Sequence, residues 1–158
     1  MCNTMFFIFL FCRYNFPEHK KYIIEYINLN KIYFYIMEDE FLQSGLTAIM
    51  DENYNTAIDY FSKIISKNEK HYKALLFRGV ANVKKGDYDS ALADLNKAEE
   101  IREKDTNDDL FYFKGVALFY SQELEKAKEQ LEKALTMKTN DEHKKEIINK
   151  YLDKINKN

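Results

Sequence analysis

Residues 85–101 read KGDYDSALADLNKAEEI, and this stretch decides the fold. It opens with Gly86 and Asp87, a pair typical of a turn between two periodic segments. Apolar side chains then recur at the spacing that places them on one face of an amphipathic helix. They are Tyr88, Ala91, Leu92, Leu95, Ala98 and Ile101. Residues 71–85, ahead of the turn, also carry apolar side chains at helical spacing, so the two segments predict a helical hairpin.

The same arrangement occurs three times along the chain. In each copy a glycine is followed twelve positions later by an alanine, and four positions after that by a large apolar residue. The three sets are Gly45, Ala57 and Phe61; Gly79, Ala91 and Leu95; and Gly115, Ala127 and Leu131. A glycine inside a helix costs about 1 kcal/mol relative to alanine. Its use at one register in every copy therefore predicts that the two helices of each hairpin approach closely there.

This register resembles that of the tetratricopeptide repeat, a helical hairpin of about 34 residues with a bulky residue, a glycine, an alanine and a large apolar residue at fixed offsets. The bulky residues that match the pattern are Phe41, Leu75 and Phe111. The resemblance covers residues 38–140. It implies an all-α fold, an α-solenoid of three helical hairpins that winds as a right-handed superhelix. The repeats it implies span about residues 38–71, 72–107 and 108–140.

The chain departs from the pattern of this family at three places in each repeat. Ser44, Arg78 and Lys114 stand where the family has a leucine, and Ala48, Asn82 and Leu118 stand where it has a tyrosine. The terminal proline is missing from every copy. A weaker resemblance concerns residues 113–135, FKGVALFYSQELEKAKEQLEKAL. This stretch is similar to the repeat module of the co-chaperone that links the ninety-kilodalton heat-shock protein to SCF ubiquitin ligases. It implies an adaptor or co-chaperone role.

A capping helix is predicted after the third repeat. Residues 139–142, TNDE, match the capping box, in which the Thr139 hydroxyl and the Glu142 carboxylate accept from free amides at a helix start. Apolar residues from Ile147 to Ile155 then alternate with lysines at helical spacing. Residues 141–156 are therefore expected to cover the end of the array with a polar outer face. A degraded fourth repeat is the alternative and predicts nearly the same helix.

Residues 1–36 differ in composition from the rest of the chain. They contain no Gly, Ala, Val, Ser, Asp or Gln, and 24 of the 36 are Phe, Ile, Tyr, Asn or Lys. A secretory signal is disfavoured, because no basic residue precedes the apolar run 5–12 and no small-residue cleavage site follows it. A genuine extension that packs on the repeats or on a membrane surface is the second interpretation. We favour a third, a gene-model artefact, because those five residue types have codons rich in A and T.

In that interpretation the repeat domain comprises residues 37–158. Met37 opens the sequence MEDEF, whose acidic side chains suit the start of a helix. Residues 37–158 hold 24 acidic and 20 basic side chains, a balance of −4, with the two signs interspersed. Nucleic-acid binding would require a basic stripe, so it is not expected. No segment has the roughly 18 consecutive apolar residues of a membrane helix.

Catalytic and metal-binding patterns are missing from the sequence of residues 37–158. There is no H-E-x-x-H, no phosphate-cradling glycine loop and no nucleophile elbow. No cysteine follows Met37, so neither a thiolate metal site nor a disulfide framework is available. We therefore predict a non-catalytic, cytoplasmic protein that needs no metal or cofactor and takes no small-molecule substrate. A nuclear location is left open.

Binding of another protein or a peptide is the function that these exclusions leave. In the family that the chain resembles, the first helices of the hairpins line a concave groove. The shared register then places ten residues in that groove: Leu42, Leu46, Met50, Lys73, Phe77, Val80, Lys84, Phe113, Val116 and Tyr120. For the two valines, packing between repeats is an equally good interpretation. The three aromatic residues are expected to be exposed in the groove or covered by another part of the chain.

Three-repeat members of the family clamp the acidic C-terminal tails of heat-shock chaperones with Lys, Arg and Asn side chains. The matching positions here are Leu42, Leu46, Phe77, Asp109 and Phe113, and none of them carries a donor for a carboxylate. We therefore predict an adaptor or scaffold that binds an apolar or amphipathic peptide instead. The alternative is a structural subunit that uses its repeats for assembly, for example as a homodimer.

Overall fold

The computed structural model describes residues 17–102, 108–137 and 141–157, and the side chains from residue 26 onward apart from those of 34, 35 and 108. These residues form seven α-helices and no strand. The helices are α2 (Pro17–Met50), α3 (Tyr54–Ile65), α4 (Tyr72–Lys85), α5 (Tyr88–Ile101), α6 (Asp108–Tyr120), α7 (Leu124–Thr136) and α8 (Glu142–Asn156). The chain divides into two compact units, Met1–Asp39 and Glu40–Asn158.

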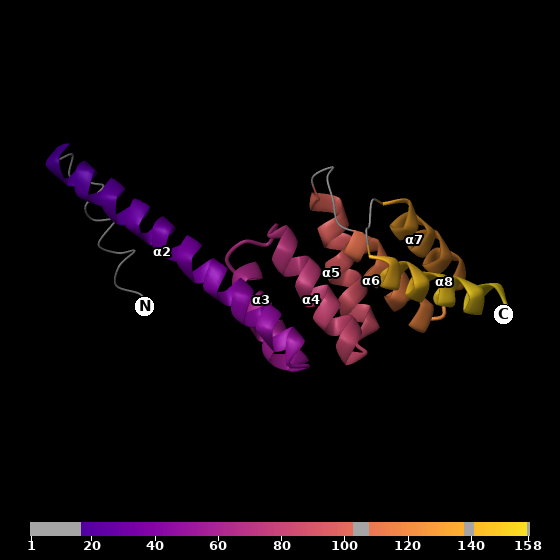
Figure 1. Cartoon of the computed structure of the whole chain (residues 1–158). Coiled ribbons are helices and arrows are strands. Elements are labelled where there is room, and N and C mark those ends of the chain that lie inside the picture. The colour runs from indigo at the N-terminus through magenta and orange to yellow at the C-terminus, as the bar shows by residue number, and fades with distance from the viewer. Residues whose placement is uncertain (1–16, 103–107, 138–140, 158) are drawn as a thin grey trace. The chain divides into compact units, whose positions relative to one another are not determined.

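The second unit is an array of helical hairpins. Its helices pack as antiparallel neighbours in chain order, and Figure 1 shows α3 to α8 side by side. The hairpins pair residues 40–50 of α2 with α3, α4 with α5, and α6 with α7. The first helices also contact one another across hairpins, α4 with α6 and α6 with α8, and we call these three helices the first-helix layer. The predicted all-α solenoid of three hairpins with a C-terminal helix is therefore confirmed.

The repeated glycines lie where the two helices of each hairpin touch. A Cβ atom built on Gly79 would lie 2.7 Å from Cγ of Leu95, and one on Gly115 would lie 2.7 Å from Cγ of Leu131. On Gly45 it would lie 2.5 Å from the ring of Phe61. The predicted close approach is present, but its tightest contact is with the large apolar residue and not with the alanine four positions earlier.

The turns of the three hairpins share one left-handed residue. Gly86 ends α4 with φ 89°, and Asp87 caps α5 by accepting a hydrogen bond from the Ser90 amide. The equivalent positions in the first and third hairpins, 34 residues earlier and 36 later, are Glu52 with φ 57° and Gln122 with φ 64°. The sequence predicted a turn only from Gly86, because non-glycine residues seldom adopt this conformation. The shared geometry shows that all three turns are built alike.

The last helix, Glu142–Asn156, starts within one residue of the predicted helix 141–156, but its cap differs from the prediction. Its N-cap is Asp141, whose side chain accepts a hydrogen bond from the Lys144 amide at 3.0 Å. Glu142 is the first helical residue, and its carboxylate pairs with Lys145. Thr139, the predicted cap, lies outside the described residues. The predicted capping box therefore named the wrong cap residue, because an aspartate is by itself a strong N-cap and can bind the amide three residues on.

Helix α2 runs through Met37 without interruption, so the prediction that a helix starts at MEDEF is wrong. Between Pro17 and Gly45 there is neither a glycine nor a second proline, and Pro17 itself occupies the first helical position that favours proline. A change in composition does not end a helix unless it brings a residue that breaks one. Within the described residues, every helix is too short or too polar to cross a membrane.

Removal of residues 1–36 is expected to leave the melting temperature of the array unchanged. The buried residues of the described chain begin at Gly45, and the ring contacts of the first hairpin start at Phe41. A chain that starts at Met37 would keep Glu38, Asp39 and Glu40 near the new helix start, where acidic side chains are favourable. Thermal melts followed by circular dichroism of both lengths would measure this. An unfolded or insoluble shorter chain would show that the first 36 residues are a structural element.

Candidate protein-interaction surface

The ten residues predicted to line the groove all lie on first helices of the hairpins. Leu42, Leu46 and Met50 belong to α2; Lys73, Phe77, Val80 and Lys84 belong to α4; Phe113, Val116 and Tyr120 belong to α6. Their exposure divides them into three groups. Val80 and Val116 are 6% and 5% exposed, so they are part of the hydrophobic core and offer no surface to a ligand. Leu42, Leu46, Phe77 and Phe113 are half-buried, whereas Met50, Tyr120 and both lysines are exposed.

Phe77 is tied to the neighbouring hairpin. Its ring lies with its centroid 6.0 Å from that of Phe61, which is fully buried in α3. Part of this side chain therefore serves packing between hairpins. Phe113 occupies the same register on α6, where its ring meets the edge of Tyr112 at 4.8 Å. Both aromatic residues keep a partly exposed edge on the first-helix layer.

Tyr120 lies in an aromatic cluster that sequence analysis did not assemble. Its ring stacks on Tyr88 from the start of α5 at 5.0 Å, and it meets Phe119 and Tyr151 edge to face. Tyr151 comes from α8 and contacts Phe119 at 5.1 Å. We call Tyr88, Phe119, Tyr120 and Tyr151 the aromatic cluster. Tyr120 is its most accessible large side chain, with 48% of its surface exposed.

Within the aromatic cluster, the environment of Tyr151 favours its neutral phenol. Burial raises the pKa of the Tyr151 phenol, and a hydrogen bond with Tyr120 raises this pKa further. Burial also raises the pKa of nearby Tyr112, although the positive charge of Lys144 partly opposes that shift. Lys144 on α8 binds Asp109 at the start of α6 at 2.6 Å. The aromatic cluster therefore offers ring faces and hydroxyl groups, and the nearby charges of Lys144 and Asp109 offset each other.

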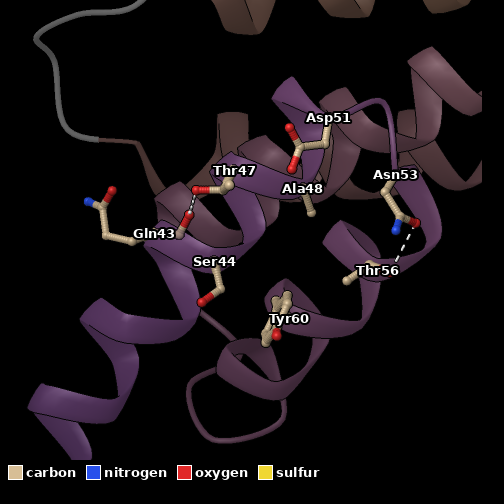
Figure 2. Close-up of a pocket in the computed structure, with 8 residues that line it drawn as sticks. All are labelled: Gln43, Ser44, Thr47, Ala48, Asp51, Asn53, Thr56 and Tyr60. Atoms are coloured by element: carbon tan, nitrogen blue, oxygen red, sulfur yellow. Dashed lines mark hydrogen bonds between the residues drawn. The ribbon is translucent and has the colours of Figure 1, made fainter.

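Two pockets lie elsewhere, between the helices of the first and second hairpins. The first, between α2 and α3, has a volume of about 410 Å³ (Figure 2). It is lined by Gln43, Ser44, Thr47, Ala48, Asp51, Asn53, Thr56 and Tyr60. The second has a volume of about 360 Å³ and is lined by Ile58, Arg78, Asn82, Lys85, Asp87, Ser90, Ala93 and Asp94. None of the ten predicted groove residues lines either pocket.

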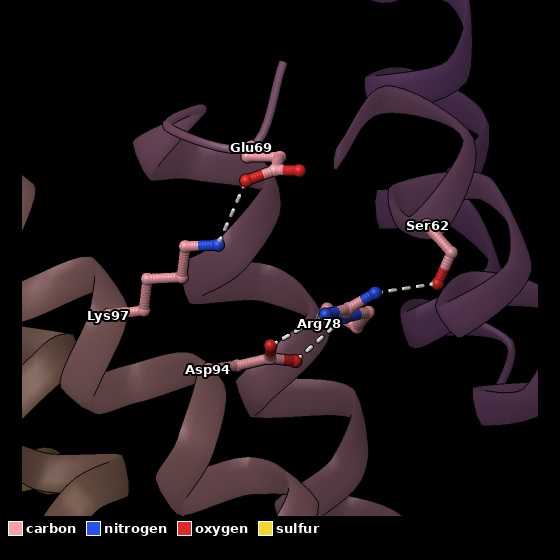
Figure 3. A network of polar contacts seen from close by, with 5 residues as sticks. All are labelled: Ser62, Glu69, Arg78, Asp94 and Lys97. Atoms are coloured by element: carbon pink, nitrogen blue, oxygen red, sulfur yellow. Dashed lines mark hydrogen bonds and ion pairs between the residues drawn. The ribbon is translucent and has the colours of Figure 1, made fainter. Parts of the chain in front are cut away.

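A polar network joins three successive helices beside the second pocket (Figure 3). Arg78 on α4 donates through Nε and Nη2 to both carboxylate oxygens of Asp94 on α5, each at 2.7 Å. Its Nη1 donates to the Ser62 hydroxyl of α3 at 2.9 Å. Asp94 is only 7% exposed, so this bidentate pair is largely shielded from water. Arg78 is one of the residues that replace the leucine of the repeat pattern, and here it ties two hairpins together.

The third hairpin has its own ionic tie at the same register. Lys114 on α6 donates to Glu99 on α5, and Lys133 on α7 donates to the other oxygen of that carboxylate at 3.0 Å. Burial of Glu99 opposes ionisation, but the hydrogen bonds and charges of the two lysines outweigh it and lower the pKa of Glu99. In the described parts of the chain, no three His, Cys, Asp or Glu side chains are grouped to hold a metal ion.

Solved structures share this architecture. The second TPR domain of human RPAP3, in complex with the HSP70 peptide SGPTIEEVD, superposes with a TM-score of 0.67 at 19% identity, over 79% of this chain and 99% of that one. The TPR2B domain of yeast Sti1 in its pHsp70 complex gives 0.67 at 20% identity, over 77% and 98%. The Sgt2 TPR domain of Aspergillus fumigatus gives 0.66 at 23% identity, over 75% and 79%. The fold is therefore that of tetratricopeptide repeat domains, as the glycine register implied.

A family model gives a second, independent match. The sequence matches no curated protein. The model of the TT21 fifth ARM repeats domain, in contrast, matches residues 47–151, about two thirds of the chain. Armadillo and tetratricopeptide repeats are both solenoids of stacked helical units, so this match agrees with the observed hairpins. The chain belongs to the TT21 fifth ARM repeats domain family.

Proposed function

We propose that this chain is a non-catalytic adaptor that binds an apolar or amphipathic segment of a partner protein on its first-helix layer. The observation that carries the proposal is the accessible aromatic surface around Phe113 and Tyr120, the latter 48% exposed. Aromatic residues of this kind supply most of the energy at protein interfaces, because they bury a large area with few rotatable bonds. Repeat arrays present such surfaces as extended faces suited to peptides.

The side chains at the clamp positions of the first helices, α2, α4 and α6, argue against an acidic peptide. The second TPR domain of RPAP3 and the TPR2B domain of Sti1 were solved with HSP70 peptides, whereas Leu42, Leu46, Phe77, Asp109 and Phe113 occupy the clamp positions here. Four of these side chains have no hydrogen-bond donor, and an ionised carboxylate buried without partners is costly. Asp109 is itself a carboxylate and lies 2.6 Å from Lys144, so this lysine already has an acidic neighbour.

Calorimetry with the peptide SGPTIEEVD is expected to show no binding, while apolar helical peptides selected from a displayed library should bind. Phe113→Ala should weaken a selected peptide about thirtyfold, because truncation of a well-placed aromatic anchor costs about 2 kcal/mol. Tyr54→Ala, a matched aromatic truncation on α3, should leave the affinity unchanged. The second TPR domain of RPAP3 serves as the positive control for the acidic peptide.

Two outcomes of this experiment contradict the proposal. Micromolar binding of SGPTIEEVD that weakens with added salt would mean that Lys73 and Lys84, both exposed on α4, form an acidic-peptide clamp. Equal weakening by Phe113→Ala and Tyr54→Ala would mean that the aromatic surface of the first-helix layer does not hold the peptide.

Assembly is a second candidate function, and an observation on the first unit favours it. Within residues 26–36, α2 exposes a set of large apolar side chains. They are Tyr26, Ile27, Leu29, Ile32, Tyr33 and Ile36, each at least 44% exposed. A helix that leaves so many apolar residues in water is typical of one that packs against a partner. Light scattering of the full chain and of residues 37–158 separates the two functions, since self-association confined to the full chain favours assembly.

A further inference from the structure

The pocket of the first hairpin and the pocket of the second are the same site in successive repeats. Moving 34 residues along the chain carries one lining onto the other at six positions. The pairs are Ser44 and Arg78, Ala48 and Asn82, Asp51 and Lys85, Asn53 and Asp87, Thr56 and Ser90, and Tyr60 and Asp94. The side chains at these equivalent positions can therefore be compared directly between the two hairpins.

In the second hairpin this site holds an arginine side chain. The guanidinium of Arg78 lies between α5 of its own hairpin and α3 of the preceding one, where Asp94 and Ser62 accept its hydrogen bonds. The preceding hairpin also lines the pocket with Ile58. A guanidinium in this place is thus supplied from within the chain and covered by a neighbouring helix.

In the first hairpin the arginine is replaced by Ser44, whose short side chain leaves the space between α2 and α3 open. Figure 2 shows Ser44, Thr56 and Tyr60 around that space, with Asp51 and Asn53 beside the turn that joins the helices. The polar atoms at this site include acceptors for a cation: the Asp51 carboxylate, the Asn53 amide oxygen and the hydroxyls of Ser44, Thr47, Thr56 and Tyr60. The Asn53 oxygen already accepts one hydrogen bond, from the Thr56 hydroxyl at 3.0 Å, and keeps a second lone pair. Among the described residues Asp51 makes no ion pair.

The outer face of the first hairpin is built for a polar neighbour. Where the second and third hairpins bury small or apolar residues against the preceding hairpin, the first exposes polar ones. Glu40 replaces Ala74 and Leu110, and Thr47 replaces Ala81 and Ala117, all four of which are 0% exposed. Gln43 replaces the half-buried Phe77 and Phe113. A further apolar hairpin would not stack here, because it would bury these polar groups without partners.

The first hairpin is also the acidic one. Residues 40–66 hold four acidic side chains (Glu40, Asp51, Glu52 and Asp59) against one basic side chain (Lys63), a balance of −3. Residues 72–101 of the second hairpin hold five of each sign, a balance of zero. Lys63 lies 5.0 Å from the ring centroid of Tyr60, so the single basic side chain of this hairpin is already placed against the aromatic wall of the pocket. A basic partner is therefore favoured at this face.

We infer that the pocket between α2 and α3 accepts an arginine side chain from a basic helix of a partner protein. The incoming helix would take the place that α3 takes on the second hairpin. Its guanidinium would lie in the pocket nearer the turn than that of Arg78, because Tyr60 stands in the place of Asp94 while Asp51 and Asn53 flank the turn. Asp51 and Asn53 would accept hydrogen bonds from the guanidinium, and Tyr60 would provide an aromatic face for it. This surface is distinct from the first-helix layer, so the chain would bind two partner segments at once.

Nuclear magnetic resonance titration of the full chain with Nα-acetyl-L-arginine methylamide tests the inference. Saturable shifts are expected at the backbone amides of Ser44, Asn53 and Thr56, and the norleucine analogue, which lacks the charge, should cause none. Ser44→Arg supplies the guanidinium from within the chain, as in the second hairpin, and should abolish the shifts. Ser66→Arg, at the exposed end of α3, adds the same charge outside the pocket and should preserve them.

Several results would overturn the inference. They are the lack of saturable shifts, equal shifts with the norleucine analogue, and shifts that persist in folded Ser44→Arg. Tighter binding of free L-arginine than of the capped form would make this a small-molecule site instead of a protein contact. If Ser44→Arg fails to fold, Asp51→Asn replaces it, and an unchanged affinity in that variant contradicts the proposed role of the carboxylate.

Discussion

Replacing Gly79 with leucine is expected to lower the free energy of unfolding by about 3 kcal/mol or more, the upper range for an overpacked core. Even a Cβ atom at this position would lie 2.7 Å and 2.8 Å from two atoms of the buried Leu95 side chain. Leucine would gain about 0.8 kcal/mol in helix propensity, so the measured loss is net of that gain. Gly115→Leu should behave alike, because Leu131 stands in the same relation to it. Chemical denaturation of each variant measures the effect.

A size exchange at the same crossing makes this prediction specific. Leu95→Ala should destabilise the parent chain, yet in the Gly79→Leu background it should recover part of the lost stability, since it removes the atoms that clash. Ala93→Leu is the matched control, because Ala93 is exposed on α5 and can gain the same side chain freely. If Gly79→Leu has the same free energy of unfolding as the parent chain, the crossing of α4 and α5 is not where the structure places it.

Removing the Asp94 carboxylate is expected to cost about 2 kcal/mol of folding stability. Asp94→Ala deletes both bonds from Arg78 and leaves that guanidinium between helices with Ser62 as its remaining partner. Loss of one member of a fully buried pair costs about 3–5 kcal/mol. Because the Arg78 side chain is 25% exposed, water can replace part of what is lost and the effect should be smaller.

The control for this prediction is an exposed ion pair in the same region. Glu69 and Lys97 lie 3.9 Å apart, with side chains 82% and 43% exposed (Figure 3). Glu69→Ala should therefore change stability by less than about 0.5 kcal/mol. Arg78→Leu introduces the leucine of the repeat pattern, and combined with Asp94→Ala it should recover stability relative to either single variant. A cost for Asp94→Ala as small as that for Glu69→Ala would show that the network is not stabilising.

The hairpins could be predicted from sequence because their determinants are local. The repeated spacing of a glycine, an alanine and a large apolar residue predicted the close helix crossing in all three hairpins. The two residues in contact at each crossing are only sixteen positions apart in sequence, as Gly79 and Leu95 are. The course of α2 was not predicted, since a compositional change at Met37 carries no helix-breaking residue. The left-handed turns at Glu52 and Gln122 were also missed, because neither residue type favours that conformation.

The candidate surface was harder to predict, because it depends on how hairpins stack. Register alone could place Val80 on the groove side of α4, but only the packing of neighbouring helices shows that it is buried. The aromatic cluster draws Tyr88, Tyr120 and Tyr151 from three helices, and no periodicity relates them. The only sequence feature that indicates this cluster is the presence of aromatic residues near the ends of helices that are neighbours in the array.

The shared left-handed turn has a consequence for the order in which the array folds. Glycine adopts this conformation freely, whereas a residue with a side chain loses about 1 kcal/mol there. The hairpin closed by Gly86 therefore forms at the lowest cost, and it is also the one that has another hairpin on each side. In a linear array, structure nucleates in the most stable unit and spreads outward. The amides of α4 and α5 should thus be protected longest, and opening should begin at the hairpins closed by Glu52 and Gln122.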